Sequence, residues 1–242
     1  SSVSNFLISL IIFYYFQSLK IDKISSLFFT CCFSTLAYTT SGTPFVDHHA
    51  IFFLLASSIL LIKYIFTEKN YLLFFVVLFF FLSFLTKQVT AAYIMLTQGV
   101  IISVYIFYEK KYLIIKYLIL SSSFIVFLII SFLIYFNIEL KDFYVQYIDY
   151  PRSIGSARIS KFEITLNGFF NDYKFIILPL ILTLILKINK IFKKNTKFSK
   201  KDIFAFLILC SFVLSSIFHQ IMTKNQIYIY FLSPIIFGVL LR

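Results

Sequence analysis

The stretch YLLFFVVLFFFLSFLTKQVTAAYIMLTQGVIISVYIFY, residues 71–108, is 38 residues long and decides how this chain folds. As one α-helix it would measure about 57 Å at 1.5 Å per residue. The hydrocarbon core of a bilayer is only about 30 Å thick and needs about 20 apolar residues to cross it. Because Lys87 is the one charged residue in the stretch, we expect two spans joined by a tight hairpin at Lys87.

The composition of the whole chain supports a membrane fold. Hydrophobic residues make up 60% of the sequence, aromatic residues 21% and charged residues 13%, whereas soluble domains are about half apolar and a quarter charged. The net charge of +12 does not indicate a nucleic-acid partner, because most basic residues flank apolar runs. The three cysteines lie inside apolar runs and form no metal or redox motif. We therefore predict an all-α, polytopic transmembrane helical bundle.

About nine apolar runs are long enough, or nearly long enough, to span a bilayer. Residues 1–242 are expected to form a single transmembrane domain. It begins at Ser1, at the edge of an apolar run, which is typical of a fragment of a longer protein. The predicted spans are approximately 3–18, 24–40, 50–66, 71–86, 89–108, 112–136, 175–190, 203–219 and 227–241.

Nine spans divide the 22 Lys and Arg residues unevenly, with 15 on one side and seven on the other. The positive-inside rule places the richer side in the cytoplasm. A basic loop at 187–202 is then cytoplasmic, and a long loop at 137–174 is outside. Pro151 and Gly155 are expected to break helix in that outer loop, which we expect to lie on the membrane surface.

The outer face carries the acid and histidine candidates for catalysis, Asp47, His48 and His49. A carboxylate at a membrane rim can act as a general base if burial raises its pKa. Asp47 could also bind a divalent metal, or cap the helix that we expect near His48. The two histidines point about 100° apart on a helix, so each could bind substrate or simply pack. Asp47, one of these histidines and His219 remain an alternative metal set, although no metal motif is present.

Cations on the same face are candidates for binding a phosphate group. These cations are Lys87, Arg152, Arg158 and Lys224. For Lys87 the alternative is a lysine that snorkels to the interface. Gln88 and His219 complete the predicted substrate-binding set. An acid, imidazoles and several cations together suit a phosphorylated amphiphile whose tail lies in lipid.

Three segments resemble the bacterial GT-C membrane glycosyltransferases, the group that includes protein O-mannosyltransferases and lipid A aminoarabinose transferases. The segments are GTPFVDHHAIFF (42–53), FLSFLTKQVTAAYI (81–94) and HQIMTKNQIYIYFLSPIIFGVL (219–240). The resemblance implies a multi-helix fold with its active site on the outer face and a polyprenyl-phosphate sugar as donor. It also implies a carboxylate that deprotonates the acceptor hydroxyl. Asp47 matches a second acidic motif of the family, the first lying upstream of Ser1, and Lys87 matches a basic residue at the lipid phosphate.

We therefore expect a glycosyltransferase in the bacterial plasma membrane, with its active face periplasmic or extracellular. Its partners would be the lipid-linked donor, membrane lipid and a lipid, glycan or protein acceptor, without nucleic acid. One alternative is a transporter or flippase of lipid-linked glycans, although that function predicts polar residues along a mid-membrane path. Another is a polysaccharide polymerase or ligase, which the arginines of the outer loop favour.

Overall fold

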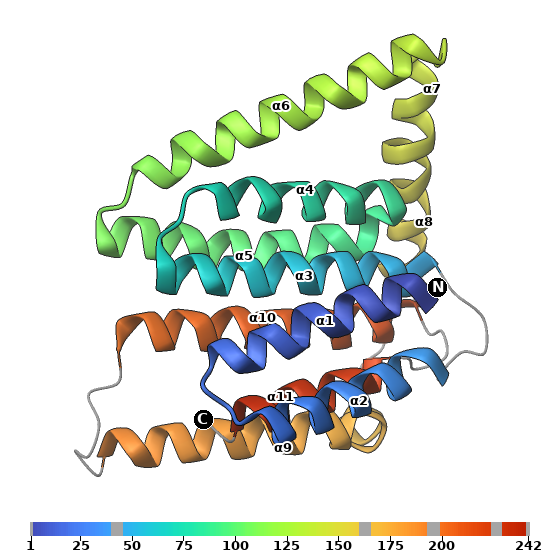
Figure 1. Cartoon of the computed structure of the whole chain (residues 1–242). Coiled ribbons are helices and arrows are strands. Elements are labelled where there is room, and N and C mark those ends of the chain that lie inside the picture. Colours follow the sequence, from blue (N-terminus) through green and yellow to red (C-terminus); the bar gives the residue numbers. More distant parts are fainter. Residues whose placement is uncertain (1, 40–45, 160–165, 193–198, 224–228, 241–242) are drawn as a thin grey trace.

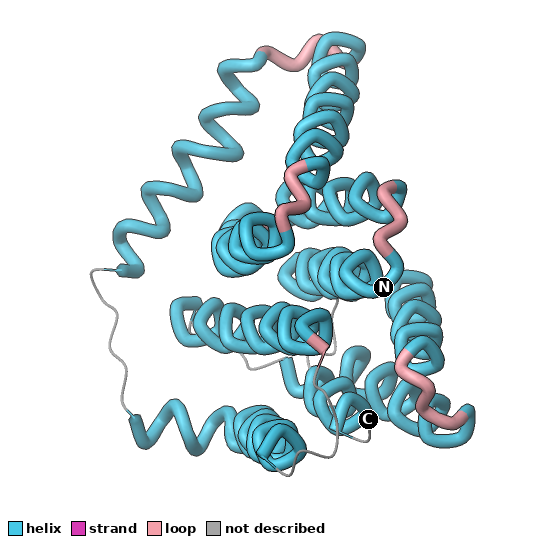
Figure 2. The backbone as a smooth tube through the Cα atoms, turned by 90° about the vertical axis from the view of Figure 1, so that its left-hand side faces the viewer, coloured by secondary structure: helices cyan, strands magenta, loops and turns pink. Residues whose placement is uncertain are grey.

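A computed structural model describes residues 2–39, 46–159, 166–192, 199–223 and 229–240. Every regular element in these ranges is a helix, so the all-α prediction is confirmed. Figures 1 and 2 show that most helices run roughly parallel to one axis, whereas the segment from α7 to α8 crosses them. The elements are α1 (Ser2–Ser18), α2 (Lys23–Thr39), α3 (Val46–Thr67), α4 (Tyr71–Thr86), α5 (Gln88–Glu109), α6 (Leu113–Tyr135), α7 (Leu140–Tyr144), the π-helix η1 (Val145–Asp149), α8 (Tyr150–Ile159), α9 (Leu166–Phe192), α10 (Lys200–Thr223), the 3₁₀-helix η2 (Ile229–Phe231) and α11 (Leu232–Leu240).

Five helices are long and apolar enough to cross a membrane: α3, α5, α6, α10 and the part of α9 from Phe169 to Leu186. This number is compatible with an integral membrane protein. The remaining apolar helices, α1, α2, α4 and the Ile229–Leu240 segment, have 17 residues or fewer. At 1.5 Å per residue a 17-residue helix measures about 26 Å, which is less than the hydrocarbon thickness of about 30 Å. Five of the described helices are thus candidate spans by length and composition, and the prediction of about nine spans is not confirmed.

Helix α3 lies at the centre of the bundle, where α1, α4, α5 and α10 pack against it. Small polar side chains join it to its neighbours. Ser83 on α4 donates to the carbonyl of Ala50 at 2.9 Å, and Gln98 on α5 donates to Ser58 at 2.8 Å. Hydrogen bonds and small residues of this kind hold apolar helices together where lipid supplies no hydrophobic drive.

The hairpin predicted at Lys87 is confirmed. Helix α4 ends at Thr86 and α5 begins at Gln88, with Lys87 alone in an extended conformation between them. The Lys87 amide donates to the Ser83 carbonyl at 2.7 Å and closes the last turn of α4. One extended residue therefore reverses the chain, and both helices remain packed against each other.

The outer segment 137–174 differs from the prediction of an irregular loop. Helices α7, η1 and α8 form a continuous helical arm, and both Pro151 and Gly155 lie inside α8. Pro151 is the second residue of α8, and it has no amide hydrogen to donate to the helix that precedes it. The π-helix immediately before it shifts the hydrogen-bond register. Helix α9 also begins at Leu166, earlier than the predicted span at 175.

The basic segment 187–202 is also more helical than predicted. Helix α9 continues to Phe192, so Lys187 and Lys190 lie on it, and α10 begins at Lys200. The predicted loop residues 193–198 lie outside the described ranges. An apolar helix can end in a lysine-rich turn because long side chains reach water from a helical backbone.

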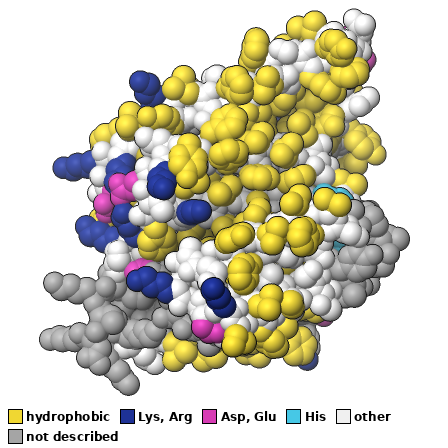
Figure 3. Space-filling model, in the orientation of Figure 1, with side chains coloured by type: hydrophobic (Ala, Val, Ile, Leu, Met, Phe, Trp, Pro, Cys, Tyr) yellow, Lys and Arg dark blue, Asp and Glu magenta, His cyan; other side chains and the backbone are white. Residues whose placement is uncertain are grey.

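The two ends of the bundle differ in charge. Lysine, arginine and acidic side chains gather on the left of Figure 3, histidine shows on the right, and apolar side chains cover much of the face between them. At the charged end Glu68, just after α3, pairs with Lys111 at 2.8 Å and with Lys201 on α10. These pairs join α3, the α5–α6 turn and α10.

Replacing Glu68 by Gln should lower thermal stability in a pH-dependent way. Hydrogen bonds from Lys111 and Lys201 lower the pKa of Glu68 from 4.5 to about 2. The contribution is therefore full above about pH 4.5 and declines as the pH falls toward 2. Because the Glu68 side chain is 44% exposed, solvent screening limits it to about 1 kcal/mol or less. The melting temperature in detergent should fall at pH 7, and the difference should narrow at pH 3.

The control for this experiment is Glu139→Gln, since Glu139 is an exposed acid at the start of α7. That variant should melt like the parent at both pH values. A Glu68→Gln difference of equal size at pH 7 and pH 3 would contradict the assignment of the effect to ionised Glu68.

Single cysteines should report the two ends of the bundle as opposite sides of a membrane. Lys69→Cys lies in the α3–α4 turn and Glu139→Cys lies between α6 and α7. In a background without the three free native cysteines, an impermeant maleimide added to intact cells should label position 139 but not 69. Equal labelling of both positions would show that the bundle axis does not cross the bilayer.

Candidate functional site

The buried carboxylate of Asp47 joins three separate parts of the chain. Asp47 lies in the first turn of α3, where an acid suits the positive end of the helix dipole. Its Oδ2 accepts from Lys87 Nζ at 2.7 Å, and its Oδ1 lies 3.0 Å from His219 Nε2. The side chain of Asp47 is only 8% exposed. The structure thus brings together an acid, a cation and an imidazole that lie far apart in the sequence.

Asp47 differs from the predicted N-cap in one respect. Helix α3 begins at Val46, so Asp47 is already inside the first turn instead of preceding it. The residue that precedes the helix lies outside the described ranges. The carboxylate of Asp47 is directed to side chains of other helices, so its role extends beyond starting α3.

The α4–α5 hairpin places the Lys87 ammonium. Helices α3 and α4 are packed side by side, and the bond from Ser83 to the Ala50 carbonyl fixes their relative position one turn from Lys87. The side chain of Lys87 is 26% exposed. An ammonium has three donors, so the one directed to Asp47 leaves two for another anion.

The last turn of α10 supplies His219, which is 1% exposed. Its Nε2 lies 3.0 Å from Asp47 Oδ1 and 3.1 Å from the hydroxyl of Thr90. An ionised carboxylate only accepts hydrogen bonds, so we assign the ring proton to Nε2. The other nitrogen, Nδ1, is buried and has no hydrogen-bond partner among the described residues. In the neutral ring Nδ1 then carries a free lone pair.

This arrangement follows the general logic of a carboxylate–histidine pair. The carboxylate fixes the tautomer and the orientation of the ring, and it stabilises the imidazolium that forms when the opposite nitrogen takes a proton. Lys87 balances the charge of Asp47 while the ring is neutral. The cluster therefore combines a buried ring nitrogen that has no partner among the described residues with a cation nearby.

Thr90 was missed by reasoning from sequence. It is fully buried on α5, three residues after Lys87. Thr90 lies in the first turn of α5, and its nearness in the sequence to Lys87, a predicted phosphate ligand, is the one signal that could have indicated it. Its hydroxyl contacts the same nitrogen of His219 as Asp47 does.

His48 and His49 do not join the cluster in the same way. The His48 ring is buried and stacks on Phe52, with centroids 6.2 Å apart, and it meets Phe231 edge-on. His49 lies on another face of α3 and is partly buried. The roughly 100° between adjacent helical residues thus separates both rings from the direction of Asp47.

Of the other residues that were predicted to bind the substrate, two are described in full. Gln88 is the first residue of α5, and Arg152 lies exposed on α8. Arg158 belongs to the backbone of α8, but its side chain lies outside the described part of the structure, as does all of Lys224. Helix α8 itself contacts α5 and α10.

A metal centre receives no support from the geometry. Within the described ranges, no group of three or more His, Cys, Asp or Glu side chains could hold a metal ion. Asp47 and His219 do meet, but they bond to each other directly. They are therefore arranged as a hydrogen-bonded pair, and not as two ligands that face a shared cation.

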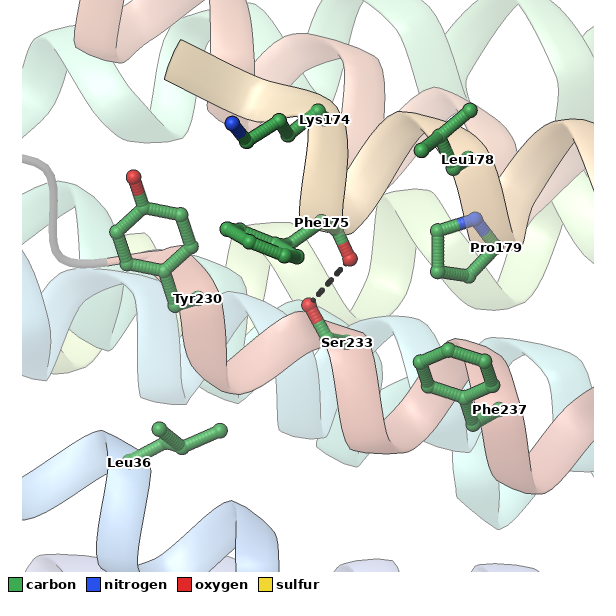
Figure 4. A pocket seen from close by; sticks show the side chains of 8 residues that line it. All are labelled: Leu36, Lys174, Phe175, Leu178, Pro179, Tyr230, Ser233 and Phe237. Carbon is green, nitrogen blue, oxygen red and sulfur yellow. Dashed lines mark hydrogen bonds between the residues drawn. The ribbon is translucent and has the colours of Figure 1, made fainter. Parts of the chain in front are cut away.

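An apolar groove of about 640 Å³ lies away from this cluster, between α9 and α11 (Figure 4). The Ser233 hydroxyl donates to the Phe175 carbonyl at 2.8 Å, and Tyr230 donates to the Asp172 carbonyl at 2.9 Å. Lys174 lies over the Phe175 ring. The hydroxyls at the groove thus serve helix packing. The lining residues are Leu36, Lys174, Phe175, Leu178, Pro179, Tyr230, Ser233 and Phe237.

Comparison with protein-family models, with curated proteins and with solved structures gives no match to this chain. The resemblance to GT-C glycosyltransferases therefore stays a prediction.

A double-mutant cycle should show that Asp47 and Lys87 stabilise the bundle as a pair. Lys87→Met leaves a buried carboxylate without its cation, which costs about 3–5 kcal/mol. Asp47→Asn should cost less, because Lys87 can extend toward water. The double variant should recover most of the loss caused by Lys87→Met, measured as unfolding in detergent.

The matched control is Lys63→Met, an exposed lysine at the other end of α3. It should leave the unfolding transition unchanged. Strictly additive losses in the double variant would contradict the coupling of the two charges.

Proposed function

We propose that this protein is a membrane glycosyltransferase that moves a sugar from a polyprenyl-phosphate donor to an acceptor hydroxyl. The observation that carries the proposal is the buried contact of Asp47 with both Lys87 and His219. Glycosyl transfer from a lipid phosphate needs a proton acceptor and a charge that stabilises the leaving phosphate. The cluster offers one group for each task.

In the proposed reaction His219 Nδ1 takes the proton of the acceptor hydroxyl. The acceptor oxygen forms a bond to the anomeric carbon of the sugar, and the bond from that carbon to the phosphate oxygen breaks. The electron pair of that bond stays on the lipid phosphate. Asp47 holds the resulting imidazolium through Nε2 and acts as a positioning residue, since its carboxylate already accepts two hydrogen bonds.

Lys87 supports the departure of the phosphate. Negative charge grows on the phosphate oxygens as the sugar leaves, and a nearby ammonium stabilises that charge more than it stabilises the bound donor. The two donors of Lys87 that are not directed to Asp47 serve this role. Gln88, the next residue, is a further polar candidate for binding the polyprenyl-phosphate sugar.

The proposed location is the outer face of a bacterial plasma membrane. The support is the separation of charge along the bundle, with lysines concentrated at the end opposite the cluster (Figure 3). The positive-inside rule orients such a bundle with the lysine end in the cytoplasm. The cluster then meets lipid-linked donors on the periplasmic or extracellular side.

A pair of His219 variants should separate catalysis from structure. A glutamine amide can occupy the place of Nε2 and donate to Asp47, whereas an asparagine amide matches the place of Nδ1 and loses that bond. His219→Gln should therefore keep the melting temperature but lose about 10²–10⁴ of kcat, the usual contribution of a general base. His219→Asn should lose stability as well.

Sugar transfer should be measured with the full-length protein and a polyprenyl-phosphate sugar, together with Asp47→Asn and Lys87→Ala. Both of these variants should reduce sugar transfer strongly. In Lys87→Ala the reason is that the leaving phosphate loses the ammonium that stabilises its charge. Full sugar transfer by His219→Gln would show that His219 is not the base. Full transfer by all the variants would show that the cluster takes no part in the reaction.

A further inference from the structure

Helix α6 leaves the bundle and opens a wedge beside α4. The two helices are packed together, but Figure 1 shows that they diverge toward the end where α7 begins. The space between them is a cavity of about 790 Å³, within the usual range for ligand pockets. We call this cavity the α4–α6 wedge. Its lining residues are Leu78, Phe81, Leu82, Leu85, Ile125, Leu128, Ile129, Phe132, Leu133, Asn137, Ile138, Asp142, Phe143, Gln146 and Tyr147.

The walls of the wedge suit an extended hydrocarbon chain. All the lining residues that α4 and α6 contribute are apolar. The share of the α6 span that is buried is only 17%, compared with 72% for α3. In a bilayer the open side of the wedge would face lipid directly, so a chain can enter sideways without crossing water.

The closed end of the wedge is polar and carries no cation among its lining residues. The polar groups there are Asn137, Asp142, Gln146 and Tyr147, from the arm of α7 and η1 and the residue at the end of α6. A carboxylate, two amides and a phenol can hydrogen-bond sugar or alcohol hydroxyls. The Asp142 carboxylate disfavours a phosphate at the same place by like-charge repulsion.

The α4 wall of the wedge ends close in sequence to Lys87 of the proposed catalytic cluster. The wedge is lined as far as Leu85, two residues before Lys87, which is about 3 Å along a helix axis. The arm that closes the wedge continues into α8, which contacts α5 and α10 (Figure 1). These are the helices that carry Thr90 and His219.

We propose that the α4–α6 wedge binds the chain of a lipid acceptor whose head group is uncharged and hydroxylated. The hydroxyls contact Asp142, Gln146 and Asn137, and one of them reaches the cluster beyond Leu85. The role as acceptor rests on the proposed glycosyltransferase function, whereas binding of the lipid does not. The wedge selects a lipid in place of a protein or a soluble glycan, and it excludes a phosphate head group.

Photo-labelling tests the binding directly, with the full chain in nanodiscs of zwitterionic lipid. One probe is dodecyl β-glucoside with a diazirine at the end of its chain, and the other is dodecyl phosphate with the same diazirine. The glucoside should label peptides of α4 and α6 more strongly than the phosphate. Asp142→Asn should raise labelling by the phosphate about threefold, as expected for one screened charge interaction.

Two tryptophan variants fill the wedge, and one matched variant does not. Leu82→Trp and Ile129→Trp place a large side chain in the cavity, whereas Phe127→Trp changes a side chain on α6 that is 63% exposed and absent from the lining. Labelling by the glucoside should fall about tenfold in the first two, equivalent to about 1.4 kcal/mol of binding. It should stay unchanged in Phe127→Trp.

Equal labelling by both probes, together with no change in the filled variants, would overturn the proposal and identify the wedge as a site of ordinary bilayer lipid. Specific labelling without sugar transfer in any assay would instead overturn the glycosyltransferase function and leave the lipid site. Transfer that proceeds to a soluble acceptor in the filled variants at the parent rate would refute the role as acceptor site.

Discussion

A carboxylate buried between helices must be compensated, and this protein compensates Asp47 with one ammonium and one imidazole from distant parts of the chain. An uncompensated charge in such a place costs several kcal/mol. The first turn of α3, the α4–α5 junction and the last turn of α10 therefore have to meet at one end of the bundle. That requirement orients three of the helices that surround α3. It also gathers an acid, an ammonium and an imidazole at one end of the bundle.

The same helices are joined again at their opposite ends, but by interactions of another kind. Glu68, Lys111 and Lys201 form exposed pairs, which contribute little each and weaken with salt. Because the cluster at Asp47 is buried, its geometry is fixed more strongly than that of the exposed pairs. The buried cluster and the exposed lysine–glutamate pairs thus join the same helices at opposite ends with unequal strength.

The hairpin was predictable because its argument is one of length: 38 residues exceed what one span can use, and Lys87 is the single charged residue among them. Counting spans also put Asp47, Lys87 and His219 at one end. Their contacts were not predictable, since positions 47 and 219 are 172 residues apart and spacing alone gives no side-chain direction. The helical arm was missed because Pro151 and Gly155 both disfavour a helix interior, whereas here a π-helix precedes Pro151 and shifts the hydrogen-bond register. The place of Pro151 in the first turn of α8, after a π-helix, cannot be inferred from local composition.

The division of roles within the cluster follows from hydrogen bonds. The Asp47 carboxylate already accepts one hydrogen bond at each oxygen, from Lys87 and from His219. In the imidazole of His219, Nε2 faces Asp47, whereas the buried Nδ1 has no hydrogen-bond partner among the described residues. In the proposed reaction the ring therefore takes the proton at Nδ1, and the acid orients the ring. A sequence motif with an acid and two adjacent histidines favours the acid or those histidines as the base, whereas the geometry favours a third histidine from another helix.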